Sequence, residues 1–205
     1  MALASNVNDF LQRVGQGVKP NMFEVRVPFP TALNTGGADD EIITLLCKST
    51  NLPGSSLGSI DVPFRGRTVK IVGDRTFDNW SAVFFNDKEM KIRSRFEKWM
   101  ESMNTHEGNS SPLFTPGGTS RYMSDVEVDQ LEKNNTANGE VLRSYKLWHA
   151  FPTSISQIDL AYDSNDQIEE FSVEFQYSYW TSPGSPESNL NATVAANANT
   201  TSITT

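Results

Sequence analysis

A strict alternation of apolar and polar residues between positions 170 and 179 is the clearest pattern in this chain. Phenylalanine, valine and tyrosine occupy every second position, and acidic or small polar residues occupy the positions between them. Successive side chains of a β-strand point to opposite faces of a sheet, so the pattern predicts a strand with an aromatic core face and a polar face. The polar face would carry Glu170, Ser172, Glu174, Gln176 and Ser178.

Two shorter segments alternate in the same way. Residues 23–27 predict one half-buried strand, and residues 124–129 predict another, in which Val126 and Val128 alternate with acidic residues. Those acidic residues are Asp125, Glu127 and Asp129, and we expect them to point away from the core.

Residues 88–103 change to helical spacing. An apolar stripe is formed by Ile92, Phe96, Trp99, Met100 and Met103, and Asn86-Asp87 directly before it predicts the helix cap. We interpret the basic residues opposite this stripe as a solvated face and not as a nucleic-acid site, because mixed charges are ordinary on amphipathic helices. Residues 8–14 predict a second, short helix.

Further strands complete a mainly β, α+β chain with one principal helix. We expect strands at residues 41–47 (buried on both faces), 69–72, 80–85, 141–150 and 158–162. Residues 28–40, 49–59 and 105–120 read as loops, and Asn138-Gly139 predicts a hairpin turn. Between the strands at 69–72 and 80–85, Gly73 and Asp74 predict a sharp turn that Arg75 and Asp78 could tie by an ion pair ahead of Trp80.

Composition limits the class of protein. The chain has 205 residues, of which 37% are hydrophobic, which suits one domain at 1–180 followed by a Ser/Thr/Asn/Ala-rich extension at 181–205 that we expect to be flexible. One cysteine excludes an internal disulfide, and we expect neither a secretory signal nor a membrane span. The net charge is −8, and the segment from Arg121 to Trp180 contains eleven acidic residues but only four basic ones. This excess indicates solubility, or a surface that does not hold a polyanion.

Catalytic and metal-binding patterns do not emerge. Two histidines and Cys47 lie in unrelated contexts, and the glycine-rich segment at 115–119 lacks the lysine of a phosphate-binding loop. Residues 163–166 lack the glycine and glutamate spacing of a calcium loop, so a β-turn is the better interpretation. We therefore expect no catalytic residues, no metal and no cofactor.

An ordered set of short motifs resembles the tail tube proteins of contractile-tailed bacteriophages and covers most of the chain from about Asn8 to Trp180. The motifs are Leu52-Pro53-Gly54, Ile60-Asp61-Val62-Pro63-Phe64-Arg65-Gly66-Arg67, Val72 to Trp80, Leu147-Trp148, Phe151-Pro152-Thr153, Asp159-Leu160, Tyr162-Asp163-Ser164-Asn165, Ile168, Phe171, Val173 and Tyr179-Trp180. The enlarged loop at 28–40 and the C-terminal extension depart from the family pattern.

The resemblance implies an antiparallel β-sandwich or barrel whose sheets join across subunits into a hexameric ring, with rings stacked into a hollow tube for DNA. It implies sheath, baseplate and tail terminator proteins as partners, no membrane, and a place in the virion tail after assembly in the host cytoplasm. A long loop carrying Leu52, Pro53, Gly54, Ile60 and Phe64 would contact the next ring. Glu170, Glu174 and Gln176, or else the row Asp125, Glu127 and Asp129, would line the lumen, where negative charge repels DNA.

Two other functions remain open at this point. A tube subunit of a related contractile injection or secretion machine would share the fold and differ in cargo. A glycan-binding β-sandwich module would instead use surface aromatic residues.

Overall fold

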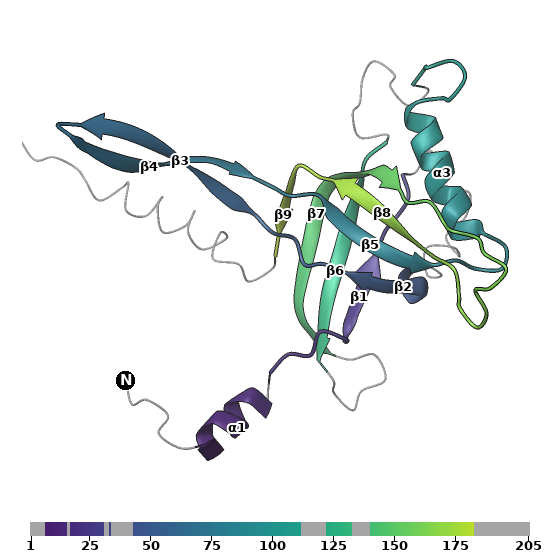
Figure 1. Ribbon diagram of the computed structural model, residues 1–205, viewed down its shortest axis with the longest axis horizontal. Coiled ribbons are helices and arrows are strands. Elements are labelled where there is room, and N and C mark those ends of the chain that lie inside the picture. The colour runs from purple at the N-terminus through teal and green to yellow at the C-terminus, as the bar shows by residue number, and fades with distance from the viewer. Residues whose placement is uncertain are drawn as a thin grey trace, which may run out of the picture.

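The computed structural model describes residues 7–15, 17–30, 33, 43–111, 122–132 and 140–182. Two helices and nine strands are bounded within these ranges, and Figure 1 shows their arrangement. They are α1 (Val7–Gly15), β1 (Phe23–Arg26), β2 (Cys47–Thr50), β3 (Ser56–Phe64), β4 (Arg67–Thr76), β5 (Trp80–Phe85), α3 (Lys91–Met103), β6 (Ser124–Glu132), β7 (Glu140–Ile155), β8 (Glu170–Gln176) and β9 (Tyr179–Thr181).

The body of the molecule is one antiparallel sheet folded over on itself. Its strand order is β1-β6-β7-β8-β5-β2, with β9 paired to β7 beside this path. The long strand β7 pairs first with β6 and then, from Phe151, with β8. Between these two parts His149 has a positive φ of 58°, and the register with β6 shifts there. This bulge bends β7, so that one strand contributes to both layers of the sandwich.

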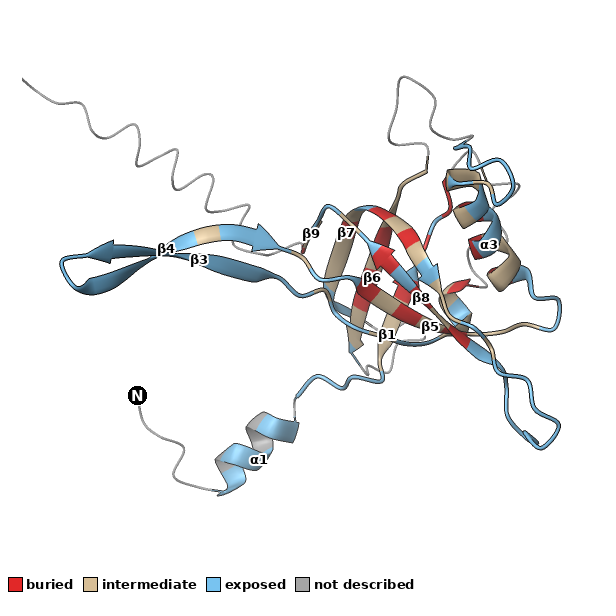
Figure 2. Cartoon of the chain, turned by 45° about the horizontal axis from the view of Figure 1, so that its top comes forward, coloured by how far each residue is buried: buried red, intermediate tan, exposed pale blue. Residues whose placement is uncertain are grey.

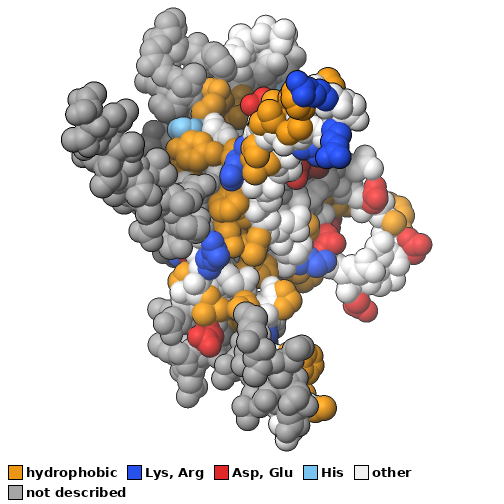
Figure 3. Space-filling view, turned by 90° about the vertical axis from the view of Figure 1, so that its left-hand side faces the viewer, with side chains coloured by type: hydrophobic (Ala, Val, Ile, Leu, Met, Phe, Trp, Pro, Cys, Tyr) orange, Lys and Arg blue, Asp and Glu red, His pale blue; other side chains and the backbone are white. Residues whose placement is uncertain are grey.

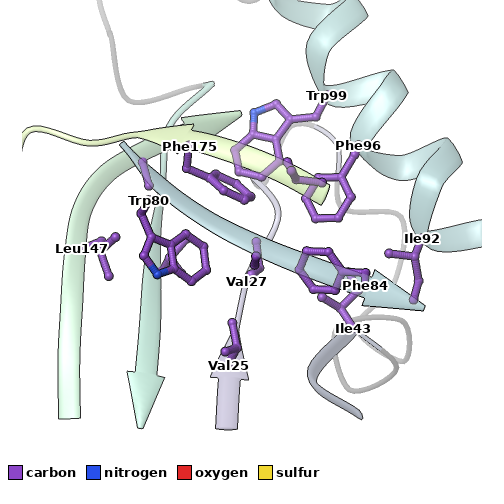
Figure 4. Close-up of a cluster of buried hydrophobic side chains, with 14 of the residues drawn as sticks. Val25, Val27, Ile43, Trp80, Phe84, Ile92, Phe96, Trp99, Leu147 and Phe175 are labelled. Atoms are coloured by element: carbon purple, nitrogen blue, oxygen red, sulfur yellow. The ribbon is translucent and has the colours of Figure 1, made fainter. Parts of the chain in front are cut away.

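The core lies between the two layers and is closed by α3 (Figure 4). Phe96 and Trp99 from α3 are fully buried, as the helical stripe predicted. The Phe96 ring lies 5.4 Å from Phe84 and 5.9 Å from Phe175, centroid to centroid, and so joins the helix to β5 and β8. The Trp99 indole N–H donates to the Tyr122 carbonyl oxygen at 2.7 Å, which satisfies its polar atom inside the core.

Two elements project from this body without joining its core. The β3–β4 hairpin extends as a long ribbon, and α1 stands apart below it (Figure 1). Coloured by burial, both elements are almost wholly exposed, whereas the buried residues gather on the sandwich strands and the inner side of α3 (Figure 2). Both elements therefore present side chains that this chain alone does not cover.

Several sequence predictions agree with the structure. The helix at 8–14 is α1, the alternating segments 23–27 and 124–129 lie in β1 and β6, and 141–150 lies in β7. Within β8, Phe171, Val173 and Phe175 are buried while Glu170 and Glu174 are exposed. The predicted turn at Asn138-Gly139, most of the loop at 28–40 and the extension beyond 182 lie outside the described residues.

Three element predictions outside the β3–β4 hairpin were wrong. Residues 43–46 are helical and not a strand, because Ile43, Leu46 and Cys47 meet the core at helical spacing while Leu45 is 81% exposed. Residues 158–162 are not a strand, since Leu160 and Tyr162 are fully or mostly exposed and pair with no described strand.

The third concerns the end of the long alternation. The alternation stops at Gln176, and β9 begins at Tyr179 after Ser178 has donated its backbone N–H to the Trp148 carbonyl. Tyr179 is thereby turned outward onto Trp148, with the two rings stacked at 6.1 Å.

The cap of α3 also differs from the prediction. The helix begins at Lys91, and the preceding residue, Met90, has a left-handed φ of 50° without a side-chain cap. Asp87 still serves the helix end, because its carboxylate accepts a hydrogen bond from the Ile92 backbone N–H at 3.4 Å. The folded unit also reaches slightly further than residue 180: Thr181 lies in β9, and the buried Ser182 accepts a hydrogen bond from Arg143 Nε at 2.9 Å.

Candidate assembly surfaces

The β3–β4 hairpin replaces the loop that the sequence predicted at 52–64. Residues 56–64 are strand β3, which pairs with β4 across a two-residue turn at Arg65 and Gly66. Both turn residues have positive φ, 44° and 81°, as the tight turns of twisted hairpins require. At about 3.3 Å per residue, the nine residues of β3 reach roughly 30 Å. Ile60 and Phe64, 56% and 62% exposed, therefore lie on the arm itself.

The other predicted contact residues, Leu52, Pro53 and Gly54, lie at the base of the arm. The Gly54 carbonyl oxygen accepts a hydrogen bond from the Trp180 indole N–H at 3.2 Å, and the Tyr177 hydroxyl lies 3.5 Å from the same oxygen. The Trp80 indole N–H donates to the Asn51 carbonyl oxygen at 2.6 Å. The base is thus fastened to the sandwich, while the distal part is free of it.

The predicted turn at Gly73 and Asp74 was wrong. Both residues lie within β4, where Gly73 faces Gly58 at a shift in register. A Cβ on Gly73 would lie 3.1 Å from the Gly58 backbone carbon, so the glycine permits a close approach of the two strands and does not form a turn.

The chain turns instead at residues 77–79, before the buried Trp80. Arg75 and Asp78 form no ion pair in the part of the chain that the structure describes. Burial first, and then the nearby Asp78 charge, raise the pKa of Tyr177.

The acidic row on β6 is largely paired with basic residues from its neighbours. Arg26 on β1 contacts Glu127 at 3.3 Å and Asp129 at 2.6 Å, and Lys146 on β7 contacts Asp125 at 3.3 Å and Glu127 at 3.9 Å. An open groove of about 680 Å³ lies along this ladder of charges.

Asp129 is a correction to the predicted lumen-facing row, because it is only 3% exposed. It accepts hydrogen bonds from Arg26 and from the Ser144 hydroxyl, and it lies on β6 between β1 and β7, directly opposite Glu24 and Ser144.

The acidic row on β8 is more open. Glu170 pairs with Lys48 of β2, and both side chains stay 45% exposed. Glu174 and Gln176 are exposed, and within the described residues Glu174 has no ion pair. Register places Glu174 opposite Ser81 and Ser172 opposite Val83, so β5 extends the same face with small and apolar side chains. The β8 part of this face is hydrophilic and weakly acidic, and the β5 part is less polar.

Unpaired strand edges form a second type of assembly surface. β1 and β2 end the strand order, so among the described residues each has one side without a partner strand. Such edges offer backbone N–H and C=O groups to another chain.

Catalysis would require a reactive nucleophile or a metal site. Burial raises the pKa of the Cys47 thiol to about 12, which leaves it protonated and a weak nucleophile at neutral pH. In the described ranges, no group of three or more His, Cys, Asp or Glu side chains could hold a metal ion. No helix in these ranges is long and apolar enough to cross a membrane.

Comparison with known proteins gives a consistent result. Residues 18–182 match the family model described as phage tail tube protein. The tail tube protein gp19 of Enterobacteria phage T4 is 29% identical over 166 residues, which cover 81% of this chain and 92% of that protein. The tail tube protein of Serratia phage KSP90 is 26% identical over 176 residues, which cover 84% and 94%.

Solved structures share the fold. A chain in the baseplate of the anti-feeding prophage superposes with a TM-score of 0.58 at 11% identity, covering 81% of this chain and 95% of that one. A chain in the sheath–tube complex of an extracellular contractile injection system, PVC, superposes with a TM-score of 0.55 at 14% identity, covering 87% and 98%.

The matched family and its named relatives are structural components of virion tails and not enzymes, in agreement with the absence of catalytic patterns in the sequence. The family match spans the sandwich, the hairpin and the last strand, β9. The chain belongs to the phage tail tube protein family.

Proposed function

We propose that this chain is the repeating subunit of a contractile phage tail tube, in which six copies form a ring and rings stack into a conduit for the genome. The observation that carries the proposal is the β3–β4 hairpin. It has no core of its own, and an isolated two-stranded ribbon is marginally stable at best in water. A ribbon about 30 Å long with exposed apolar side chains suits a contact with another subunit.

Ring closure would use the free edges of the sandwich. One repeated contact between unlike edges, such as β1 of one copy and β2 of the next, generates a closed ring when the rotation per subunit divides a full turn. The sheets would then continue from subunit to subunit around a lumen, which removes the exposed edges.

Stacking would use the distal hairpin, with Ile60 and Phe64 at the contact. Leu52, Pro53 and Gly54 would act indirectly, by fixing the direction of the arm through the anchors at Trp80 and Trp180. This division of roles follows from the exposure of the arm and the hydrogen bonds at its base.

The face of β8 with Glu170, Glu174 and Gln176 is the better candidate for the lumen wall. The competing row on β6 is matched by Arg26 and Lys146, and its Asp129 is buried. Glu174 keeps an uncompensated charge, which would repel the DNA backbone and let it slide without specific binding.

Partners of the tube would be the tail sheath, the baseplate and the tail terminator. The fold alone is shared with tubes of extracellular injection systems, so it does not separate a phage tail from such a machine. Sequence identity of 26–29% with named phage tail tube proteins favours the phage tail.

The proposal is tested on the purified full-length chain by sedimentation and negative-stain electron microscopy over a range of concentrations. Rings and stacked tubes are the expected result, with growth at high concentration or on a baseplate nucleus. A protein that stays monomeric under all these conditions, and that never forms rings, would refute it.

A further inference from the structure

The β3–β4 hairpin is amphipathic across its two faces. Residues directly opposite one another share a face, and register pairs Ile60 with Ile71, Val62 with Val69, and Phe64 with Arg67. Five of these six side chains are apolar and are 39–62% exposed. The apolar face of the hairpin is therefore Ile60, Val62, Phe64, Val69 and Ile71.

The opposite face of the hairpin is mainly polar. It carries Thr68 opposite Pro63, the ion pair between Lys70 and Asp61 at 3.0 Å, and Ser59 opposite Val72. One face is thus suited to water and the other is not, although both are exposed in the single chain.

Helix α1 carries a second uncovered apolar surface. Val7, Phe10, Leu11 and Val14 follow the i, i+3, i+4, i+7 spacing that places them on one side of a helix. They are 56–71% exposed, and this stripe belongs to no hydrophobic cluster among the described residues. The helix lies before residue 18, where the match to the family model begins.

The two apolar surfaces match in size. The stripe from Val7 to Val14 extends about 10 Å along the helix, and the apolar hairpin face from Ile60 to Phe64 extends about 13 Å along the strand. Strands of a two-stranded ribbon lie about 5 Å apart, which gives the ribbon, with its side chains, a width close to that of a helix. A helix can therefore cover this face completely.

We propose that α1 of one copy docks on the apolar face of the β3–β4 hairpin of another copy. This inference rests on the proposed function, and it identifies the segment that the stacking hairpin contacts in the other copy. A contact between unlike surfaces of identical chains repeats from copy to copy and so propagates a stack.

The exposed area agrees with this occupant. The nine apolar side chains of the two surfaces are 39–71% exposed. Burying them together would remove on the order of 1,000 Å² of accessible surface, which is the area that a specific interface needs. Figure 3, which views the molecule from the side of the arm, shows hydrophobic side chains gathered on this face of the molecule.

Site-directed cross-linking tests the contact in assembled tubes. Cys47→Ala is used as the background, and two differently tagged chains are mixed, one with Leu11→Cys and the other with Val69→Cys. Oxidation should give a disulfide-linked pair that contains both tags. The matched control replaces Val69→Cys by Thr68→Cys, which lies next to it on the polar face, and the linked product should fall about tenfold or more because effective concentration depends on geometry.

A charge test complements the cross-link. Leu11→Glu should stop stacking but leave the monomer folded, Val69→Lys on the other surface should restore it, and Asn8→Glu, off the stripe, should have no effect. Equal cross-linking from Thr68→Cys, or tubes that grow normally with Leu11→Glu, would overturn the inference and leave the tail tube assignment standing. In a chain that carries both Leu11→Cys and Val69→Cys, a link formed within the single chain at high dilution would show that α1 closes on its own hairpin and would also overturn it. If wild-type protein forms no tubes at all, the proposed function itself fails.

Discussion

Shortening the hairpin separates assembly from folding. In the variant, residues 61–70 are replaced by Asn-Gly, so that a two-residue turn joins Ile60 to Ile71, which already face each other. The bulge at Gly58 and Gly73 and the anchors at Gly54 remain in place. The sandwich therefore keeps its connection, and only the distal arm is lost.

The expected change in the free energy of unfolding is small. The removed apolar side chains, Val62, Phe64 and Val69, are 39–62% exposed and belong to no core cluster. The ion pair between Asp61 and Lys70 is mostly exposed, and such pairs contribute about 0–1 kcal/mol. The closed loop also becomes shorter, which slightly favours folding. We expect a net change within about 1 kcal/mol.

Urea unfolding followed by tryptophan fluorescence measures this change, and electron microscopy measures tube growth. The variant should unfold near the wild-type midpoint and form no tubes. A loss of several kcal/mol would show that the arm supports the core, and normal tubes would show that the arm is not a stacking element. Either result would refute the reasoning.

Four further predictions concern single features. Phe96→Ala should lower the free energy of unfolding by about 3–5 kcal/mol in urea titrations, because this fully buried ring packs between the helix and strands β5 and β8. Asp129→Ala should cost about 1–3 kcal/mol in the same assay, since it removes the hydrogen bonds that the buried carboxylate accepts from the half-exposed Arg26 and the half-buried Ser144. The Cys47 thiol should react slowly with a disulfide reagent at pH 8 until urea unfolds the chain, and stability should fall as the pH rises from 9 toward 12, because the unfolded thiol ionises first. Glu170→Lys with Glu174→Lys should let assembled tubes retain DNA, and added salt should release it.

Matched variants give these predictions their controls. Lys98→Ala, on the exposed side of α3, should change stability by less than about 0.5 kcal/mol. Glu127→Ala, whose carboxylate is 35% exposed, should cost less than Asp129→Ala. Glu101→Lys with Glu107→Lys adds the same charge away from β8, and DNA retention by that variant would show that the β8 face is not the lumen wall.

Much of the sandwich could be predicted because each of its main elements follows a single hydrophobic period, either that of a strand or that of a helix. Phe171, Val173 and Phe175 alternate because β8 has a core on one face and water on the other. The stripe of α3 was equally clear, since Ile92, Phe96 and Trp99 meet a single apolar surface. Local sequence and tertiary environment agree at these positions.

The remaining elements depended on distant contacts. Gly73 followed by Asp74 predicts a turn from local sequence alone. In the structure Gly73 instead permits the close approach of Gly58 on the opposite strand. Asp129 looked solvent-facing because its partner, Arg26, lies 103 residues away. The sequence predicts a loop at 49–59, where the hairpin begins, because Pro53, Gly54 and Gly58 interrupt any alternation, and the register that aligns the apolar face of the hairpin exists only once the two strands pair.

A cryo-electron microscopy reconstruction of tubes grown from the full-length chain tests the central claim most directly. The account predicts six subunits per ring, a continuous β-barrel with Glu174 on the lumen side, and the β3–β4 hairpin crossing the boundary to the neighbouring ring. Tubes in which the hairpin folds back within its own ring, or in which the β8 face lies on the outer surface, would contradict it.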